Sequence, residues 1–296
     1  GPLDKHGLLD PDSPPVAEMI PDYGILDTIG YDYQPRDAYF LRITKGCIRS
    51  CKFCAVPKLE KEFGYLTQVE EQVESVNEAY GERQNLVVLD NNILGIDEIR
   101  ERIADIGKIG FERGAIRNGR KRYVDFNQGI DARIISKYPD LAGHLASICL
   151  SPVRLAFDIN SPKMENAYRR AITLLAKQGF NTFTNYMLFN YDDTPRDFYH
   201  RLFVNAELNE QLGIRITGFP MRYIPMSDAK RGYVSPKWQW RYLRGIQCIL
   251  LATHGLVSPH TDFIHAAFGS SYEEFLEIMA MPDRYIIFRK EYKKNE

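Results

Sequence analysis

Short runs of apolar or β-branched residues recur along the chain, and a stretch with helical signals follows each of them. These runs are residues 40–44, 86–89, 123–126, 153–157, 182–188 and 214–219. Strands that alternate with helices predict an α/β fold with a parallel sheet, because neighbouring parallel strands need a crossover connection. The pattern is compatible with a doubly wound open sheet and with a βα barrel.

Helix starts are marked by a Ser or Thr that precedes an acid or a proline, as in Thr67-x-x-Glu70, Ser161-Pro162, Thr194-Pro195-x-Asp197 and Ser235-Pro236. Such residues satisfy the free N–H groups of a first helical turn. Gly81 and Gly213 predict the ends of two of these helices. A further helix is predicted near residues 271–281, and residues 1–36 are predicted to be an extended lead-in segment.

Composition excludes several classes of protein. The chain has 296 residues, of which 44% are hydrophobic, so it has enough apolar side chains for a sizeable core. Its 38 Lys and Arg residues balance 39 Asp and Glu residues, so overall charge predicts neither nucleic-acid nor membrane-surface binding. No stretch approaches the roughly 20 apolar residues of a membrane span. The N-terminus lacks the apolar core of a signal peptide, and we expect a cytoplasmic protein.

Five cysteines stand at positions 47, 51, 54, 149 and 248. An odd number with three members in one short loop is not a disulfide framework, and it indicates metal or redox chemistry in a reducing compartment. The three form a Cys-x3-Cys-x2-Cys arrangement directly after the first predicted strand. Iron–sulfur clusters are normally held by four thiolates, so three would leave one iron open to another ligand. The two remaining cysteines lie in apolar runs and are predicted to be core residues.

A zinc site is the alternative interpretation of this loop. Zinc prefers four ligands in tetrahedral geometry. The fourth would have to come from Cys149, Cys248 or a distant histidine, and no histidines show a paired metal-binding spacing.

The segment Cys47-x3-Cys51-x-Phe53-Cys54 resembles the signature of the radical S-adenosylmethionine (SAM) superfamily. The resemblance implies a partial (β/α)6 TIM-like barrel over residues 37–222, followed by a C-terminal extension over 223–296. It also implies an oxygen-sensitive [4Fe-4S] cluster held by the three cysteines, with SAM on the open iron and Phe53 near its adenine. Reductive cleavage of SAM would yield a 5′-deoxyadenosyl radical that abstracts a substrate hydrogen. The electron would come from an external low-potential donor of the flavodoxin or ferredoxin type.

Candidate SAM contacts in the first half of such a barrel lie at the carboxyl ends of strands. Asp90-Asn91-Asn92 follows the second strand, where the family often has a Gly-Gly-Glu type segment that receives the SAM amino group. This sequence departs from that pattern, and a simple turn is the alternative. Gln128 and Arg133 follow the third strand, and Arg133 is predicted to pair with the SAM carboxylate. The alternative there is a helix-capping Asp131 with a solvated arginine.

Candidate contacts in the second half are Asp158, Asn185 and Arg222. The resemblance implies a ribose contact for Asp158, which ends the fourth strand. It implies polar pocket positions near the adenine for Asn185 and Arg222. No residue can be assigned as a hydrogen-transfer partner.

Motifs that the sequence lacks limit the range of reactions that we expect. Two isolated cysteines are too few for a second cluster. The segments 20–23 and 90–92 resemble the cobalamin-linked branch of the superfamily. However, only about 36 residues precede the first strand, too few for a cobalamin domain, and the Asp-x-His-x-x-Gly motif is missing. Two alternatives stay open: the sequence is part of a longer protein that carries this domain, or the protein is a relative of that branch without the cobalamin domain.

Basic residues alternate with aromatic ones after the sixth strand: Arg222, Lys230, Arg231, Lys237, Arg241 and Arg244, with Tyr223, Tyr233, Trp238, Trp240 and Tyr242. Such residues can bind single-stranded nucleic acid by charge and stacking, whereas the alternative is an amphipathic helix whose aromatic side chains pack internally. A second basic run over residues 113–122 precedes the third strand and is predicted to be a solvated loop on the opposite face. We therefore expect a nucleotide or RNA substrate. The alternatives are a peptide or small-molecule substrate, or a non-catalytic zinc or iron–sulfur module that binds nucleic acid.

Overall fold

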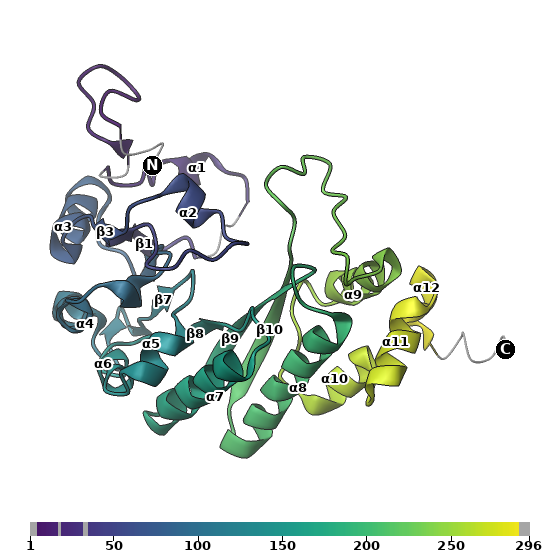
Figure 1. Cartoon of the computed structure of the whole chain (residues 1–296). Helices are drawn as coiled ribbons and strands as arrows, with labels where there is room; N and C mark the ends of the chain where they lie inside the picture. The colour runs from purple at the N-terminus through teal and green to yellow at the C-terminus, as the bar shows by residue number, and fades with distance from the viewer. Residues whose placement is uncertain (1–4, 17–18, 32–34, 290–296) are drawn as a thin grey trace. The chain divides into compact units, whose positions relative to one another are not determined.

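The computed structural model describes residues 5–16, 19–31 and 35–289. The chain forms two compact units, Gly1–Arg154 and Leu155–Glu296, and the division falls inside one strand. Figure 1 shows the first unit in purple to teal and the second in green to yellow. Each unit is described by itself below. The predicted boundary after residue 222 stays a prediction.

The first unit contains a three-stranded parallel sheet with strand order β1-β4-β7. Strand β1 (Ala38–Leu41) pairs with β4 (Asn85–Val88), and β4 pairs with β7 (Val124–Phe126). Two small antiparallel pairs accompany this sheet: β2 (Thr44–Lys45) with β3 (Gly64–Tyr65), and β5 (Ile116–Arg117) with β6 (Arg120–Lys121).

The helical segments of the first unit are α1 (Ile25–Thr28), α2 (Val56–Leu59), α3 (Val69–Tyr80), η2 (Ile93–Gly95), α4 (Ile99–Ile106), η3 (Gly107–Phe111), α5 (Ala132–Lys137) and α6 (Leu141–Leu145). Helix α3 buries Val69, Val73 and Val76, which lie on one face because residues three and four apart are helical neighbours. The predicted capping box at its start does not form. Gln68 is the N-cap, but its side chain makes no capping hydrogen bond to α3, and the Thr67 hydroxyl donates to the Gln68 carbonyl.

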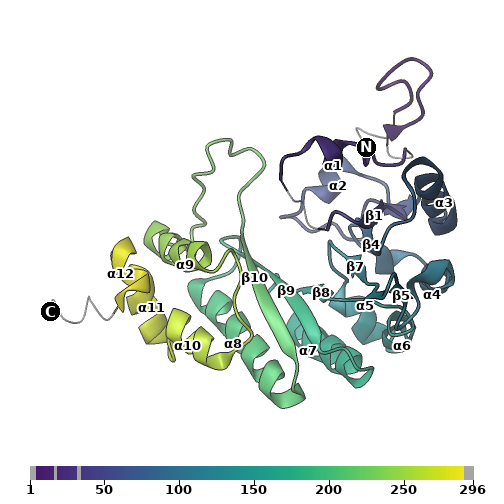
Figure 2. The same cartoon turned by 180° about the vertical axis from the view of Figure 1, so that it is seen from behind.

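The second unit contains a three-stranded sheet with strand order β10-β9-β8. Strand β9 (Thr182–Phe189) and strand β10 (Arg215–Arg222) pair in parallel over their whole length, and β8 is Val153–Ala156. Helices α7 (Pro162–Lys177) and α8 (Pro195–Leu212) cover one face of this sheet, and Figure 2 shows the opposite face, with β9 and β10 in front. Alternate residues of β9 are buried, which indicates that one of its faces packs into the core.

Both helices on that sheet begin as predicted. Ser161 accepts a hydrogen bond from the Met164 N–H, and Thr194 forms a full capping box with Asp197. Gly213 ends α8 in the left-handed conformation that favours glycine.

The C-terminal helices are α9 (Trp240–Ala252), α10 (Thr261–Phe268), α11 (Tyr272–Ala280) and α12 (Asp283–Ile287). The prediction that a helix begins at Ser235 is wrong, because α9 begins five residues later. Ser235 is buried, where its hydroxyl donates to the Tyr191 carbonyl and its N–H donates to the Asn190 side chain. Its side chain is therefore committed to a neighbouring loop and caps no helix.

The predicted α/β class is confirmed. Every predicted strand is present with its bounds shifted by only a few residues, and helices separate the strands. The lead-in also packs onto the first strand, because the Tyr23 hydroxyl accepts a 2.7 Å hydrogen bond from the Phe40 N–H. Over the described ranges, no helix has the length and apolar character needed to cross a membrane.

Candidate functional site

The cysteine loop follows β2 in the first unit and begins at a glycine. Gly46 has φ of +70°, and a Cβ at this position would overlap the backbone carbonyl of Glu62. Only glycine combines this backbone conformation with so close an approach of another backbone segment. Gly46 therefore sets the direction in which the chain enters Cys47.

Hydrogen-bond donors surround the sulfur atoms of this loop. Cys47 Sγ accepts from the Arg49 N–H at 3.4 Å and from the Asn92 side-chain amide at 3.6 Å. Cys54 Sγ accepts from the Val56 N–H at 3.4 Å. Cys51 interacts with the guanidinium of Arg133. Donors and cations beside sulfur stabilise the thiolate, and hydrogen bonds to cluster sulfurs tune reduction potential.

The chemistry of these donors fits a cluster held by three thiolates. Within the described residues, no three His, Cys, Asp or Glu side chains converge on a common point, so neither a zinc site nor a cluster site is fully gathered. The other two cysteines have a different environment. Burial raises the pKa of Cys149 to about 11, and it also raises the pKa of Cys248. Both thiols therefore stay protonated at neutral pH, as expected for residues in apolar surroundings.

Asp90 and Asn91 hold together the chain segments around the loop. The Asp90 carboxylate accepts from the Ile43 N–H, the Thr44 N–H and the Thr44 hydroxyl, at 2.9, 2.5 and 2.5 Å. Burial raises the pKa of Asp90 to about 6, although these hydrogen bonds oppose the shift. The Asn91 amide donates to Glu60, which also accepts from the Gly46 N–H.

Asn92 differs from its two neighbours. Its amide nitrogen donates to Cys47, but among the described residues its buried side-chain oxygen has no hydrogen-bond partner. A buried acceptor without a donor costs free energy, so such an atom is a natural contact for a bound cation or ammonium group. This oxygen belongs to the side chain whose amide contacts Cys47, and the predicted contact of Asn92 with SAM stays a prediction.

Arg133 shares a carboxylate with an arginine that sequence analysis did not identify. Asp131 accepts from Arg133 Nε at 2.7 Å and from Arg49 Nε at 2.8 Å, and it caps α5 by accepting from the Arg133 N–H. Burial favours a higher pKa for Asp131, but the two arginines outweigh it and lower the pKa. The capping alternative for Asp131 is therefore present, and Arg133 also reaches Cys51. Arg49 could have been identified from the sequence as a candidate, because it is a basic residue inside the cysteine motif.

The remaining predicted residues of the first unit are Phe53 and Gln128. Phe53 is half-buried within the cysteine loop. Gln128 is exposed, and its amide donates to Asn127. The structure thus gathers Asn92 and Arg133 around the cysteines, whereas the assigned roles of Phe53 and Gln128 stay predictions.

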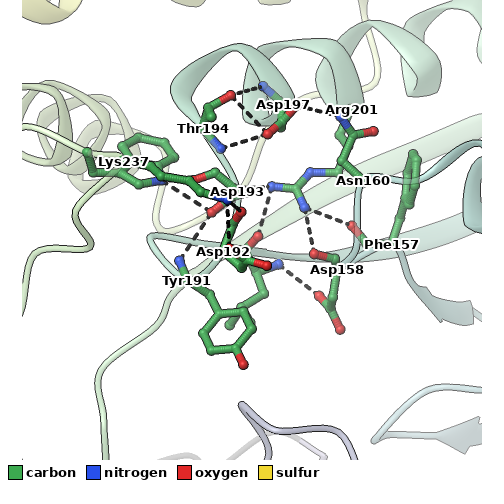
Figure 3. Close-up of polar contacts among 12 residues, drawn as sticks. Phe157, Asp158, Asn160, Tyr191, Asp192, Asp193, Thr194, Asp197, Arg201 and Lys237 are labelled. Carbon is green, nitrogen blue, oxygen red and sulfur yellow. Dashed lines mark hydrogen bonds and ion pairs between the residues drawn. The ribbon is translucent and has the colours of Figure 1, made fainter.

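Asp158 lies in a polar cluster of the second unit, shown in Figure 3. Its carboxylate accepts from the Leu188 N–H at 2.8 Å, and its carbonyl accepts from Arg201 at 2.8 Å. Arg201 also donates to the Leu188 carbonyl and to the Asp193 carboxylate. Trp238 Nε1 donates to the Asp193 carbonyl. This cluster joins the ends of β8 and β9 to the start of α8, and it holds Asp158 in place.

Arg201 and Asp193 were missed by the sequence analysis, because charged residues are rarely fully buried. Burial raises the pKa of Asp193, although Arg201 and several hydrogen bonds oppose the shift. A usable signal was the position of Arg201 on α8, three residues after Phe198 and directly before Leu202, two residues that face the core.

Asn185 lies in the middle of β9 and is fully buried. Alternation places it on the same strand face as Phe183, Met187 and Phe189, and the latter two pack in the helical core. Within the described residues, neither polar atom of its side chain has a hydrogen-bond partner. Its predicted contact with SAM stays a prediction.

Arg222 lies at the end of β10. Its Nη2 donates to the Tyr233 carbonyl at 2.6 Å, and its guanidinium carbon lies 5.0 Å from the centre of the Trp240 ring. Burial lowers the pKa of Arg222, and the nearby Arg231 lowers it further.

Comparison with known proteins gives a short sequence match. No family model matches the chain. RimO, the ribosomal protein uS12 methylthiotransferase of Stenotrophomonas maltophilia (strain K279a), is 37% identical over 54 residues, which are 18% of this chain and 11% of that protein. RimO of Xanthomonas campestris pv. campestris (strain 8004) has the same identity over 54 residues and is covered over 10% of its length. The match thus spans about a tenth of the length of these curated relatives.

A solved structure, the crystal structure of HydG, a maturase of the [FeFe]-hydrogenase, covers 72% of this chain and 49% of its own, with a TM-score of 0.48 and 17% identity. A likeness at this level carries no argument about this chain. The short match to RimO, together with the spacing of Cys47, Cys51 and Cys54, confirms that this chain resembles the radical SAM superfamily.

Proposed function

We propose that this chain is a radical SAM enzyme whose cluster is held by the thiolates of Cys47, Cys51 and Cys54. The observation that carries the proposal is the environment of the three sulfurs, which are met by two backbone N–H groups, the Asn92 amide and the Arg133 guanidinium. When bound, the cluster supplies the electron that cleaves SAM into methionine and a 5′-deoxyadenosyl radical. That electron comes from an external low-potential donor of the flavodoxin or ferredoxin type.

The chain's own residues bind and orient SAM. The free side-chain oxygen of Asn92 is positioned to accept from an ammonium group near Cys47. Arg133 binds a carboxylate by exchanging part of its contact with Asp131, which Arg49 continues to neutralise. The roles predicted for Asp158, Asn185 and Arg222, which belong to the second unit, stay predictions.

Anaerobic reconstitution with iron and sulfide tests this proposal. We expect about four irons and four sulfides per chain, and 5′-deoxyadenosine from SAM with dithionite as reductant. The Cys51→Ala variant loses both iron and product. The Cys149→Ala variant is the matched control and keeps both, because that thiol is buried away from the loop. A single zinc without SAM cleavage would overturn the proposal, as would a Cys51→Ala variant that still forms 5′-deoxyadenosine.

The proposed substrate is a nucleotide or an RNA, supported by the basic and aromatic residues that follow β10. A peptide is the second candidate, because RimO is named as a methylthiotransferase of a ribosomal protein. The alternative to an enzyme is a non-catalytic module that binds nucleic acid through zinc or an iron–sulfur cluster. The reconstitution experiment separates it, since such a module leaves SAM intact.

A further inference from the structure

The segment between β10 and α9 is a long loop that extends beyond the end of β10 (Figure 1). We define the basic loop as residues 223–239, with Arg222 and Trp240 at its two ends. The loop and the residues discussed with it all belong to the second unit. Its tip is solvent-exposed, with Met226, Lys230 and Arg231 among the exposed side chains.

Two of the six basic residues between positions 222 and 244 are neutralised by carboxylates. Lys237 pairs with Asp192 at 2.7 Å, and Arg244 pairs with Asp283. Across the described ranges, Lys230 and Arg231 have no ion-pair partner. Asp228, the acid of this segment, accepts instead from the Tyr233 N–H. Lys230 and Arg231 of the basic loop therefore carry positive charge that no ion pair within the described residues neutralises.

Arg222 extends this uncompensated charge into the base of the loop. It is half-buried, it has no carboxylate partner in the described part of the chain, and its buried Nε atom lacks a hydrogen-bond acceptor. Burial lowers its pKa and the positive charge of Arg231 lowers it further, because the two guanidinium groups repel each other, whereas the Asp228 carboxylate opposes this shift. An anion bound between Arg222 and Arg231 would relieve this repulsion and satisfy the free N–H donors.

An exposed aromatic face lies beside these two cations. Trp240 is 50% exposed and has the Arg222 guanidinium over its ring. Trp238, only two residues earlier, is 5% exposed, and its Nε1 donates to Asp193. The prediction that the aromatic residues pack internally therefore holds for Trp238 but not for Trp240. The exposed ring of Trp240, with the Arg222 guanidinium 5.0 Å from its centre, offers a stacking surface beside a positive charge.

We propose that Arg222, Arg231 and Trp240 bind a phosphate and an adjacent base of a single-stranded nucleic acid, with Lys230 contacting a neighbouring phosphate. This assignment rests on the proposed function, since it identifies the substrate as a strand. The combination favours a strand over an acidic peptide, because peptides carry charge without obligatory planar rings. It favours a single strand over a duplex, because stacking needs an unpaired base.

Fluorescence anisotropy with a fluorescein-labelled 12-nucleotide single-stranded RNA tests the assignment on the full chain. We expect the Lys230→Glu/Arg231→Glu variant to weaken binding at least tenfold and to reduce the slope of log Kd against log salt by about 1.4, the value for two lost phosphate contacts. Trp240→Ala weakens binding about tenfold, whereas Trp240→Phe retains most of it because a stacking face remains. Arg113→Glu/Lys121→Glu is the matched control, because it makes the same charge change at exposed residues elsewhere and leaves binding unchanged.

Competition separates the alternative ligands. We expect an unlabelled single strand to displace the probe, and a duplex, a mononucleotide and polyglutamate to compete at least tenfold more weakly. Equal competition by any of these three overturns the assignment to a single strand. An unchanged affinity in Trp240→Ala, or equal losses in the matched control, also overturns it.

The binding experiment tests the assignment of the basic loop separately from the proposed function. Oligonucleotide binding is measured without the cluster, whereas 5′-deoxyadenosine formation is measured without an oligonucleotide. A chain that cleaves SAM but does not bind the single strand overturns only the assignment of the basic loop. A chain that binds the strand through Trp240 but does not cleave SAM overturns the proposed function.

Discussion

The two units each contain a cluster of arginine and aspartate, and the clusters differ in burial. In the first unit, Asp131 lies between Arg49 and Arg133, whose side chains are 34% and 38% exposed. In the second unit, Arg201 is 0% exposed and pairs at 2.6 Å with Asp193, which is 5% exposed. Of these two clusters, one therefore lies at a partly open surface and the other lies in the core.

This difference in burial separates a site that can exchange ligands from one that holds the fold. A fully buried charge that loses its partner stays uncompensated, so the Arg201 pair must remain intact. Arg133 keeps solvent contact and also reaches Cys51, so it can give up part of its bond to Asp131 for another anion. Within the described residues, Arg222 resembles Arg201 in having a buried Nε atom without an acceptor, but Arg222 has no ion pair like the one between Arg201 and Asp193.

The largest effect is expected from Arg201→Met, which leaves Asp193 buried without its cation. We expect the free energy of unfolding of the second unit to fall by about 3–5 kcal/mol. Urea denaturation followed by tryptophan fluorescence measures this, because both tryptophans lie in that unit. Arg196→Met on the same helix is the control. It removes an exposed pair with Glu273 at 3.9 Å and should cost less than about 1 kcal/mol. Equal losses in the two variants would contradict the comparison.

The second prediction compares two carboxylates of the first unit with opposite pKa shifts. The pKa of Asp90 is raised to about 6 in the folded state, so the folded chain holds this proton more tightly than the unfolded chain. The stability that wild type has over Asp90→Asn is therefore largest below the unfolded pKa of 3.8. It should decrease by on the order of 3 kcal/mol as the pH rises from there through the folded pKa of about 6.

Asp131→Asn should show the opposite dependence. The pKa of Asp131 is lowered in the folded state, so its contribution is present above the unfolded pKa and is lost as the pH falls through the folded pKa. Urea unfolding followed by circular dichroism at pH 3 to 7 measures both variants against wild type. Differences of the same sign in the two variants would show that the environments of the two carboxylates do not differ as described.

The smallest effect compares the helix starts of the two units. Thr194→Ala removes the capping box of α8 and should cost about 1 kcal/mol. Thr67→Ala should change stability by less than about 0.5 kcal/mol, because Thr67 accepts no hydrogen bond from α3. Thermal unfolding measures both changes. A loss of stability in Thr67→Ala as large as that in Thr194→Ala would contradict this comparison and support the capping box that the sequence predicts at Thr67.

Local patterns predicted the strands and most helix boundaries correctly, because neighbouring residues decide them. The capping box of α8 is confirmed, since Thr194, Pro195 and Asp197 all act within one turn. The error at Ser235 has a tertiary cause, because Asn190 and Tyr191 accept its hydrogen bonds. The error at α3 is a shift of the N-cap by one residue, from Thr67 to Gln68.

The sequence by itself determined the alternation of strands and helices and the three cysteines in one loop, because both depend on residues close together in the chain. Only the tertiary structure decided which polar groups are satisfied and which are left free. Asp90 meets Thr44 across 46 positions, Asn92 meets Cys47 across 45, and Arg201 meets Phe157 across 44. A hydrogen bond over such separations is formed by packing, so no local pattern reveals that Asn92 keeps a free oxygen or that Arg222 keeps an uncompensated charge.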